Sequence, residues 1–193
     1  MTKKFILASN SPRRKELLTN SGYIFEVKPS DCDESINENL TPQETVKELA
    51  RRKAVSVLSC NEDAVVLGCD TVVAVDGRIL GKPSDREDAF RMLMSLSGKK
   101  HIVSSGVCIA DKYRCECFEN TTEVEFYPLS EETVNSYLDT MEYTDKAGSY
   151  GIQGYGSALV KGINGDYFSV MGLPVSQCVR VLSDFGIEGK IKV

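Results

Sequence analysis

The sequence has little of what several common classes of protein require. Its 193 residues contain one histidine, and they include neither a CxxC pair nor an HExxH motif. A multi-histidine metal site is therefore excluded, and the seven cysteines are not expected to form a zinc site or a disulfide framework. We expect most of them to be small, buried, apolar residues in a reducing compartment.

Long hydrophobic runs and basic blocks are also missing. No apolar run approaches the ~20 residues of a membrane-spanning helix, and the N-terminal apolar stretch is too short for a secretory signal. We therefore expect a cytoplasmic protein with no membrane partner. The net charge is -5, and the only basic clusters are Arg13–Lys15 and Arg51–Lys53. These argue against a nucleic acid polymer and favour a small phosphorylated ligand, although such triplets are usually solvated helix faces.

The order of strand-like and helix-like segments predicts an α/β fold with a mixed sheet flanked by helices. Ala64–Gly68 is a strongly apolar strand, and Thr41–Glu44 has the form of a capping box. Asp76-Gly77 and Asn164-Gly165 both signal hairpin turns, and Ser84–Glu87 predicts a second helix cap. The length suits one good core, or two lobes that share a sheet. We expect a single domain over residues 1–193.

The turn after the first predicted strand has the features of a phosphate site. Ser9–Arg14 leads into a helix whose free N–H groups and positive dipole end suit an anion. Arg13 and Arg14 in that first turn are unfavourable for the dipole, and a bound anion would resolve the conflict. The alternative is that both arginines point to solvent at a cost of a few tenths of a kcal/mol.

Three further side chains complete a candidate constellation. Lys53 lies close to the apolar stripe of its helix, so its ammonium either snorkels at the core edge or points into a polar cleft. Asp70 ends the apolar strand, where open α/β sheets bind ligands; otherwise it is a turn aspartate that satisfies backbone N–H groups. Together with Glu34, Asp70 could hold a divalent metal, because Mg²⁺ takes one or two carboxylates plus phosphate oxygens and water. The sole histidine, His101, is more typical of a structural residue.

Six short segments follow one another in order and span most of the chain: Ser9–Leu18, Asp70–Val73, Gly81–Pro83, Leu96–Val103, Asp145–Gly154 and Gly172–Pro174. They resemble the motifs of the Maf family. The sequence has no Walker A, GxGxxG or GxSxG pattern that would indicate another class. Ser169-Val170-Met171 stands where members often carry Asn-Val-Val, a difference on the scale of packing.

The resemblance implies two lobes around a central cleft, similar to the inosine triphosphate pyrophosphatases. It implies hydrolysis of a nucleoside triphosphate between the α and β phosphates with Mg²⁺ or Mn²⁺. Asp70 would accept a proton from the attacking water, and Glu34 with Asp70 would help to hold the metal. The positions that match the family's phosphate-gripping basic residues are Arg13, Arg14, Lys53 and Lys82.

Within the family, Arg13, Thr71 and Gln153 resemble the subgroup that acts on dTTP and UTP. A glutamine amide has a donor and an acceptor that can match a uracil or thymine edge, and such a site can reject other bases. Modified pyrimidine nucleotides are plausible substrates as well. Two alternatives stay open: a nucleotide-binding regulator of cell division, because the family is associated with inhibition of septum formation, and a pyrophosphatase for a methylated guanine nucleotide. A homodimer is the default expectation for such folds.

Overall fold

Strands and helices alternate along the chain in a computed structural model that describes residues 3–36 and 39–192. The chain divides into two compact units. Unit 1 contains the chain up to Asp70, Ser105–Asn120, and the chain from Gly172 onward. Unit 2 contains Thr71–Ser104 and Thr121–Met171.

Each unit has its own elements, and three long strands contribute residues to both. Unit 1 holds β1 (Lys4–Leu7), α1 (Pro12–Asn20), β2 (Glu26–Val27), α2 (Pro42–Leu58) and α6 (Val175–Asp184). Unit 2 holds β4 (Arg78–Leu80), α3 (Arg86–Leu96), α4 (Glu131–Asp139), β7 (Val160–Asn164), α5 (Tyr167–Met171) and the 3-10 helices η1 (Glu142–Asp145), η2 (Ala147–Ser149) and η3 (Gly154–Leu159). The three long strands are β3 (Ala64–Val75), β5 (Lys100–Ala110) and β6 (Cys115–Phe126).

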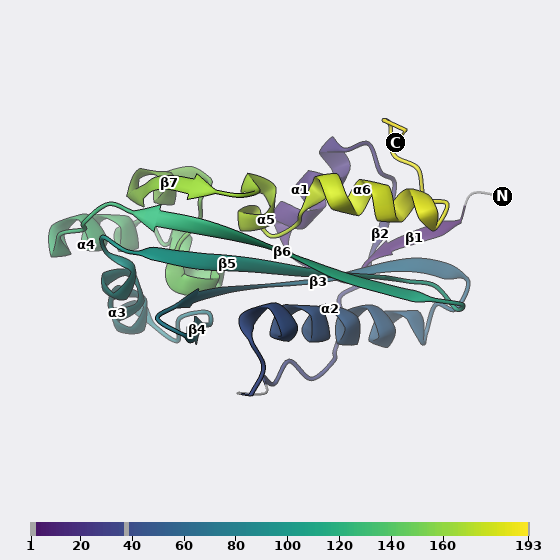
Figure 1. The fold of residues 1–193 in the computed structure, drawn as a ribbon, viewed down its shortest axis with the longest axis horizontal. Helices are drawn as coiled ribbons and strands as arrows, with labels where there is room; N and C mark the ends of the chain where they lie inside the picture. Colours follow the sequence, from purple (N-terminus) through teal and green to yellow (C-terminus); the bar gives the residue numbers. More distant parts are fainter. Residues whose placement is uncertain (1–2, 37–38, 193) are drawn as a thin grey trace. The chain divides into compact units, whose positions relative to one another are not determined.

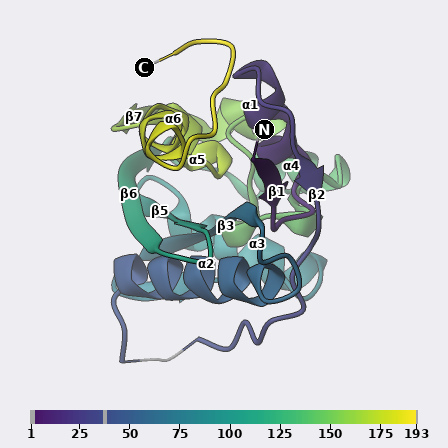
Figure 2. The ribbon, with the colours of Figure 1, turned by 90° about the vertical axis from the view of Figure 1, so that its right-hand side faces the viewer.

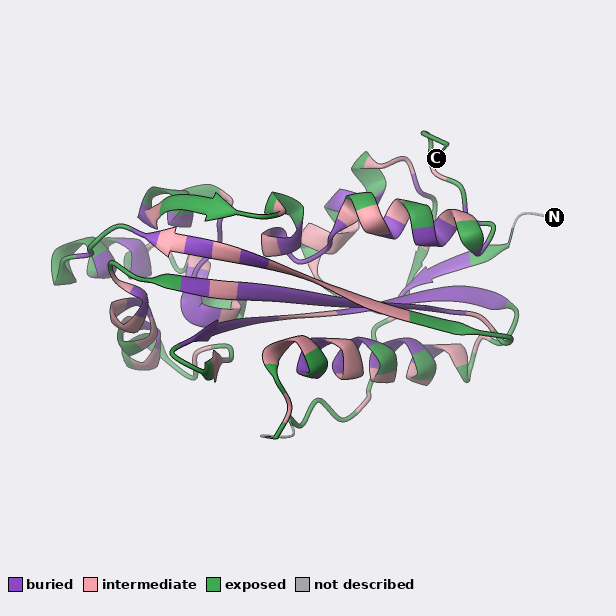
Figure 3. Ribbon diagram, in the orientation of Figure 1, coloured by how far each residue is buried: buried purple, intermediate pink, exposed green. Residues whose placement is uncertain are grey.

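The seven strands form one mixed sheet, which confirms the predicted α/β class. Their order is β2-β1-β3-β5-β6-β7, with β4 paired to β3. β1 pairs in parallel with β2 and β3, whereas β4 and β7 pair antiparallel with β3 and β6. In Figure 3 β3 and β5 are almost wholly buried, while β6 is exposed at its start and alternates between buried and intermediate residues at its end.

In unit 1, helices cover both faces of the strands. Figures 1 and 2 place α2 on one face and α1 with α6 on the other. The apolar stripe of α2 packs on strand residues such as Ile6, Val66 and Cys108. The Thr41 side chain and the Glu44 carboxylate close the capping box at its start, which confirms the prediction from the sequence.

Some local predictions are confirmed and others are wrong. Asp76 and Gly77 form the β3–β4 turn, both at positive φ. Asn164-Gly165 forms no hairpin. β7, which ends at Asn164, pairs with the earlier strand β6, and the chain continues from β7 into α5 and not into another strand. The α3 cap is the Asp85 side chain, which accepts from Asp88 N, and not Ser84.

The expectation of mostly buried cysteines is also wrong. Cys69, Cys108 and Cys178 are buried, but Cys60 and Cys115 are exposed and the other two are intermediate. Among the described residues, no helix combines the length and apolarity needed to cross a bilayer.

The core of unit 2 contains the sole histidine in an aromatic cluster. His101 Nε2 lies 2.8 Å from the Tyr150 hydroxyl oxygen, and both rings meet Phe126 edge to face. The His101 residue is 3% exposed. Burial lowers the pKa of His101 to about 4, against a usual value of 6.5, because the charged imidazolium would lose its water. The predicted structural role of His101 is consistent with this placement.

We predict that His101 makes the protein less stable in mild acid. The unfolded imidazole binds a proton near pH 6.5 and the folded one only near pH 4, so stability present above pH 6.5 is lost as the pH falls toward 4. The loss should reach up to about 3 kcal/mol. Urea unfolding of the protein and of His101→Gln at both pH values measures the difference. Equal pH dependence in the two proteins would contradict the assignment.

Candidate active site

A largely buried ion pair in unit 1 is the centre of the candidate site. Lys53 Nζ on α2 donates a hydrogen bond to Asp70 Oδ1 on β3 at 2.6 Å, and it lies 3.2 Å from Glu34 Oε1. The Lys53 and Asp70 side chains are 10% and 14% exposed, whereas Glu34 is 59% exposed on its loop. The structure therefore brings together the lysine and both carboxylates that the sequence analysis selected.

Two glycines explain how α2 approaches the strands so closely. A Cβ at Gly68 would collide with the carbonyl oxygen of Ala50, and one at Gly106 would collide with that of Val46. Gly68 comes two residues before Asp70 on β3, and Ala50 comes one turn before Lys53 on α2. Close backbone contact at Gly68 thus places the lysine within hydrogen-bonding distance of the aspartate.

The carboxylates decide the charge of Lys53. Burial alone would lower the pKa of Lys53, and the Arg14 charge also opposes protonation. The Asp70 carboxylate, which binds the ammonium directly, and the Glu34 carboxylate outweigh both effects and raise the pKa above its ordinary value. Lys53 is therefore a fixed cation that bridges two carboxylates. The alternative of an ammonium snorkelling to solvent is wrong.

Arg14 supports the backbone next to this pair. Its Nε donates to Gly172 O at 2.9 Å, and its Nη1 donates to Cys69 O at 2.8 Å and to Ser9 Oγ at 3.1 Å. The alternative of an Arg14 side chain pointing into solvent is therefore wrong, because it binds the residue preceding Asp70. Arg13 lies in the same first turn and is half-buried.

The remaining predicted residues lie in unit 2. Thr71 follows Asp70 directly and is half-buried, and Lys82 is exposed in the loop after β4. Gln153 is half-buried immediately before η3. The Gly148 amide donates to Gly81 O at 3.0 Å. This bond ties the loop that carries Lys82 to the glycine-rich segment that carries Gln153.

Glu142 anchors the segment around Gln153, and the sequence analysis did not select it. Its carboxylate accepts from the backbone amides of Tyr155 at 2.9 Å and Gly156 at 3.2 Å. It also accepts from the Tyr137 hydroxyl at 3.3 Å. The only signal in the sequence is an acidic residue shortly before a glycine-rich stretch, and that pattern does not reveal which amides the carboxylate binds.

The donor set of unit 1 suits a hard divalent cation. Glu34 and Asp70 bring carboxylate oxygens to the same point, the Lys53 ammonium. Two carboxylates with room for phosphate oxygens and water are the ligands that Mg²⁺ prefers. Glu34 and Asp70 are thus the residues that would hold such an ion.

The chain matches the family described as Maf-like protein over residues 4–185. It is 52% identical over 188 residues to a Bacillus velezensis protein named dTTP/UTP pyrophosphatase. The aligned residues cover 97% of this chain and 100% of that relative. A Bacillus pumilus protein of the same name is 50% identical over 184 residues, covering 95% of this chain and 97% of the relative. A third such protein, from Bacillus cereus, is 50% identical over 186 residues, covering 96% and 92%.

We predict a strong energetic coupling between Lys53 and Asp70. In a double-mutant cycle with Lys53→Met and Asp70→Asn, the coupling in the free energy of unfolding should be about 1.5–3 kcal/mol, because the charged hydrogen bond is shielded from water. The matched control is Lys99 with Asp76, which are 2.8 Å apart but 47% and 70% exposed. That pair should give less than about 1 kcal/mol. Equal coupling energies in the two cycles would contradict the prediction, because burial would then not strengthen the Lys53–Asp70 interaction.

Proposed function

The chain belongs to the Maf family, and on this premise we propose that it hydrolyses dTTP and UTP to the monophosphate and pyrophosphate. The buried Lys53–Asp70 pair with Glu34 beside it carries the proposal, because triphosphate hydrolysis needs positive charge for the phosphates and a base for water. The relatives named dTTP/UTP pyrophosphatase support the choice of substrate. Such nucleotides belong to the cytoplasmic pool, which is the compartment we propose.

Asp70 is the proposed proton acceptor. Lys53 engages Oδ1 of this carboxylate, so Oδ2 is the oxygen assigned to the water proton. The water oxygen forms a bond to the α-phosphorus, and the bond from that phosphorus to the oxygen bridging to the β-phosphate breaks. The electron pair leaves with pyrophosphate, and Asp70 later returns its proton to solvent. Arg14 keeps the backbone in place by binding Cys69 O.

Positive charge stabilises the departing pyrophosphate. A divalent cation held by Glu34 and Asp70, Mg²⁺ or Mn²⁺, would supply electrostatic stabilisation of the phosphate oxygens. The basic side chains do the same from the protein side. Lys53 is a fixed cation at the carboxylates. The other residues proposed to bind phosphate are Arg13, Arg14 and Lys82.

Recognition of the base is assigned to Gln153, with Thr71 as a second substrate-binding residue. Uracil and thymine present an N–H between two carbonyl oxygens, and a glutamine amide can pair with that edge. Cytosine presents a different pattern of donors and acceptors, so an amide that is held in one orientation selects against it. Glu142 holds the backbone that follows Gln153, and it is therefore a positioning residue.

We predict that Asp70→Asn abolishes most turnover of dTTP and UTP. Loss of a general base costs roughly 10²–10⁴-fold in rate. The assay measures released pyrophosphate and released orthophosphate separately, with Mg²⁺ or Mn²⁺ present. Asp76→Asn, at the exposed β3–β4 turn, is the matched control and should keep full activity. Orthophosphate as the first product would contradict the assigned bond, and an active Asp70→Asn protein would contradict the assigned base.

We predict that Gln153→Leu lowers kcat/KM for dTTP and UTP more than it lowers kcat/KM for CTP. Removing the amide leaves the base edge unpaired, which costs about 1–3 kcal/mol, so kcat/KM for dTTP and UTP should fall roughly 10–100-fold. The value for CTP should change less. Tyr155→Phe, in the same segment and 68% exposed, controls for damage to the loop. An unchanged ratio of UTP to CTP turnover would rule out base recognition by Gln153.

A further inference from the structure

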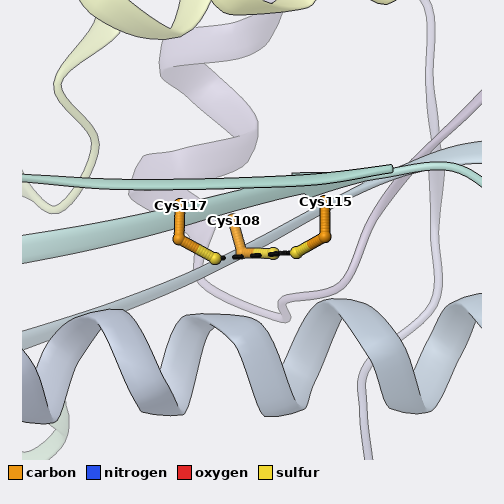
Figure 4. Close-up of side chains that lie close together, drawn as sticks. All are labelled: Cys108, Cys115 and Cys117. Carbon is orange, nitrogen blue, oxygen red and sulfur yellow. Dashed lines mark hydrogen bonds between the residues drawn. The ribbon is translucent and has the colours of Figure 1, made fainter. Parts of the chain in front are cut away.

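Three cysteines of unit 1 meet in a cluster that the proposed reaction does not use. Cys108 on β5 lies 3.0 Å, sulfur to sulfur, from Cys115 on β6, and Cys115 lies 3.6 Å from Cys117. Figure 4 shows the three side chains converging from the two strands. Within residues 3–36 and 39–192 this is the one group of three or more potential metal-ligating side chains whose ligand atoms all lie within 4.8 Å of one another.

The β5–β6 hairpin produces this cluster. The Asp111 amide donates to Arg114 O at 3.0 Å, which pairs the two residues at the hairpin end. Counting along the two antiparallel strands from there sets Cys108 opposite Cys117. Cys115 and Cys117 are two residues apart on one strand and so project from the same face. Two strands together thus supply three thiols at one point.

The distances suit a shared metal ion. Zinc binds thiolate sulfur at about 2.3 Å, so two sulfurs on one tetrahedral zinc are separated by about 3.8 Å. The Cys115–Cys117 separation of 3.6 Å is close to this value. The Cys108–Cys115 separation of 3.0 Å is shorter, so these two sulfurs would move apart when they share an ion, and both separations are longer than the ~2.05 Å of a disulfide. We propose that Cys108, Cys115 and Cys117 form a three-sulfur site that binds a thiophilic metal ion, Zn²⁺. Soft thiolates favour such an ion over the hard cation assigned to Glu34 and Asp70.

The surroundings allow an ion to enter and balance its charge. Cys108 is buried beside α2, whereas Cys117 is half-buried and Cys115 exposed, so one side of the site opens to solvent for a fourth ligand such as water. When the ion binds, the three thiols release their protons to solvent. The three thiolates and Zn²⁺ together then carry one net negative charge. The Arg51 guanidinium on α2 interacts electrostatically with Cys115 and Cys117, and its positive charge opposes that excess.

Cobalt is the direct probe, because only sulfur ligation gives a thiolate-to-Co²⁺ charge-transfer band in the near ultraviolet. The full chain, reduced and stripped of metal with a chelator, is titrated with Co²⁺ without oxygen and then with Zn²⁺. We expect one Co²⁺ per chain with the band, and displacement by Zn²⁺. Cys115→Ser and Cys117→Ser should each weaken binding at least about tenfold. Cys60→Ser, an exposed thiol outside the cluster, should bind like the unchanged protein.

A second measurement separates binding from folding. Because a ligand of the folded state raises its stability, Zn²⁺ should raise the Tm of the unchanged protein and of Cys60→Ser, but raise that of Cys117→Ser much less. Circular dichroism checks that each variant folds. The proposal is wrong if the reduced protein gives no sulfur band, or if the band persists unchanged in Cys115→Ser and Cys117→Ser. Neither outcome depends on nucleotide hydrolysis, and Asp70→Asn should leave the band intact.

Discussion

The ion pair between Lys53 and Asp70 is the interaction on which the candidate active site depends. Removing two charges from water is unfavourable, and only close contact makes the arrangement stable. Here the contact is 2.6 Å, and Glu34 adds a second carboxylate at 3.2 Å from the same nitrogen. A buried pair contributes little to stability relative to an apolar pair of the same shape. Its presence at the end of an apolar segment therefore points to chemistry.

Contacts of the surrounding backbone hold the Lys53–Asp70 pair in place. Gly68 lets α2 contact β3 directly, which fixes the distance between the two charged side chains. Arg14 binds both Cys69 O and Gly172 O, so it links the residue before Asp70 to α1 and to the segment at Gly172. A reacting group must be held within about 0.5 Å of its productive position. Gly68 and Arg14 provide that precision through their contacts with the backbone.

Sequence reasoning identified the local features and missed those made by distant segments. The capping box at Thr41 and the turn at Asp76 follow from short patterns, and the structure has both. Lys53 and Asp70 also follow from local patterns, because Lys53 lies close to the apolar stripe of its helix and Asp70 ends an apolar strand, where open α/β sheets bind ligands. Glu142 was missed because the amides it binds are 13 and 14 residues away. The cysteine cluster was missed because its Cys108 comes from a neighbouring strand, which no CxxC search detects.

The role of the Lys53–Asp70 pair can be tested with a crystal structure that contains Mn²⁺ and a UTP analogue with nitrogen between the α and β phosphates. We expect manganese bound by Glu34 and Asp70, phosphate oxygens within hydrogen-bonding distance of Lys53, and a water between Asp70 and the α-phosphorus. Phosphates bound away from Lys53, with its bond to Asp70 unchanged at 2.6 Å and no water or metal at that carboxylate, would contradict it. The pair would then be a structural ion pair, and the base would have to be sought elsewhere.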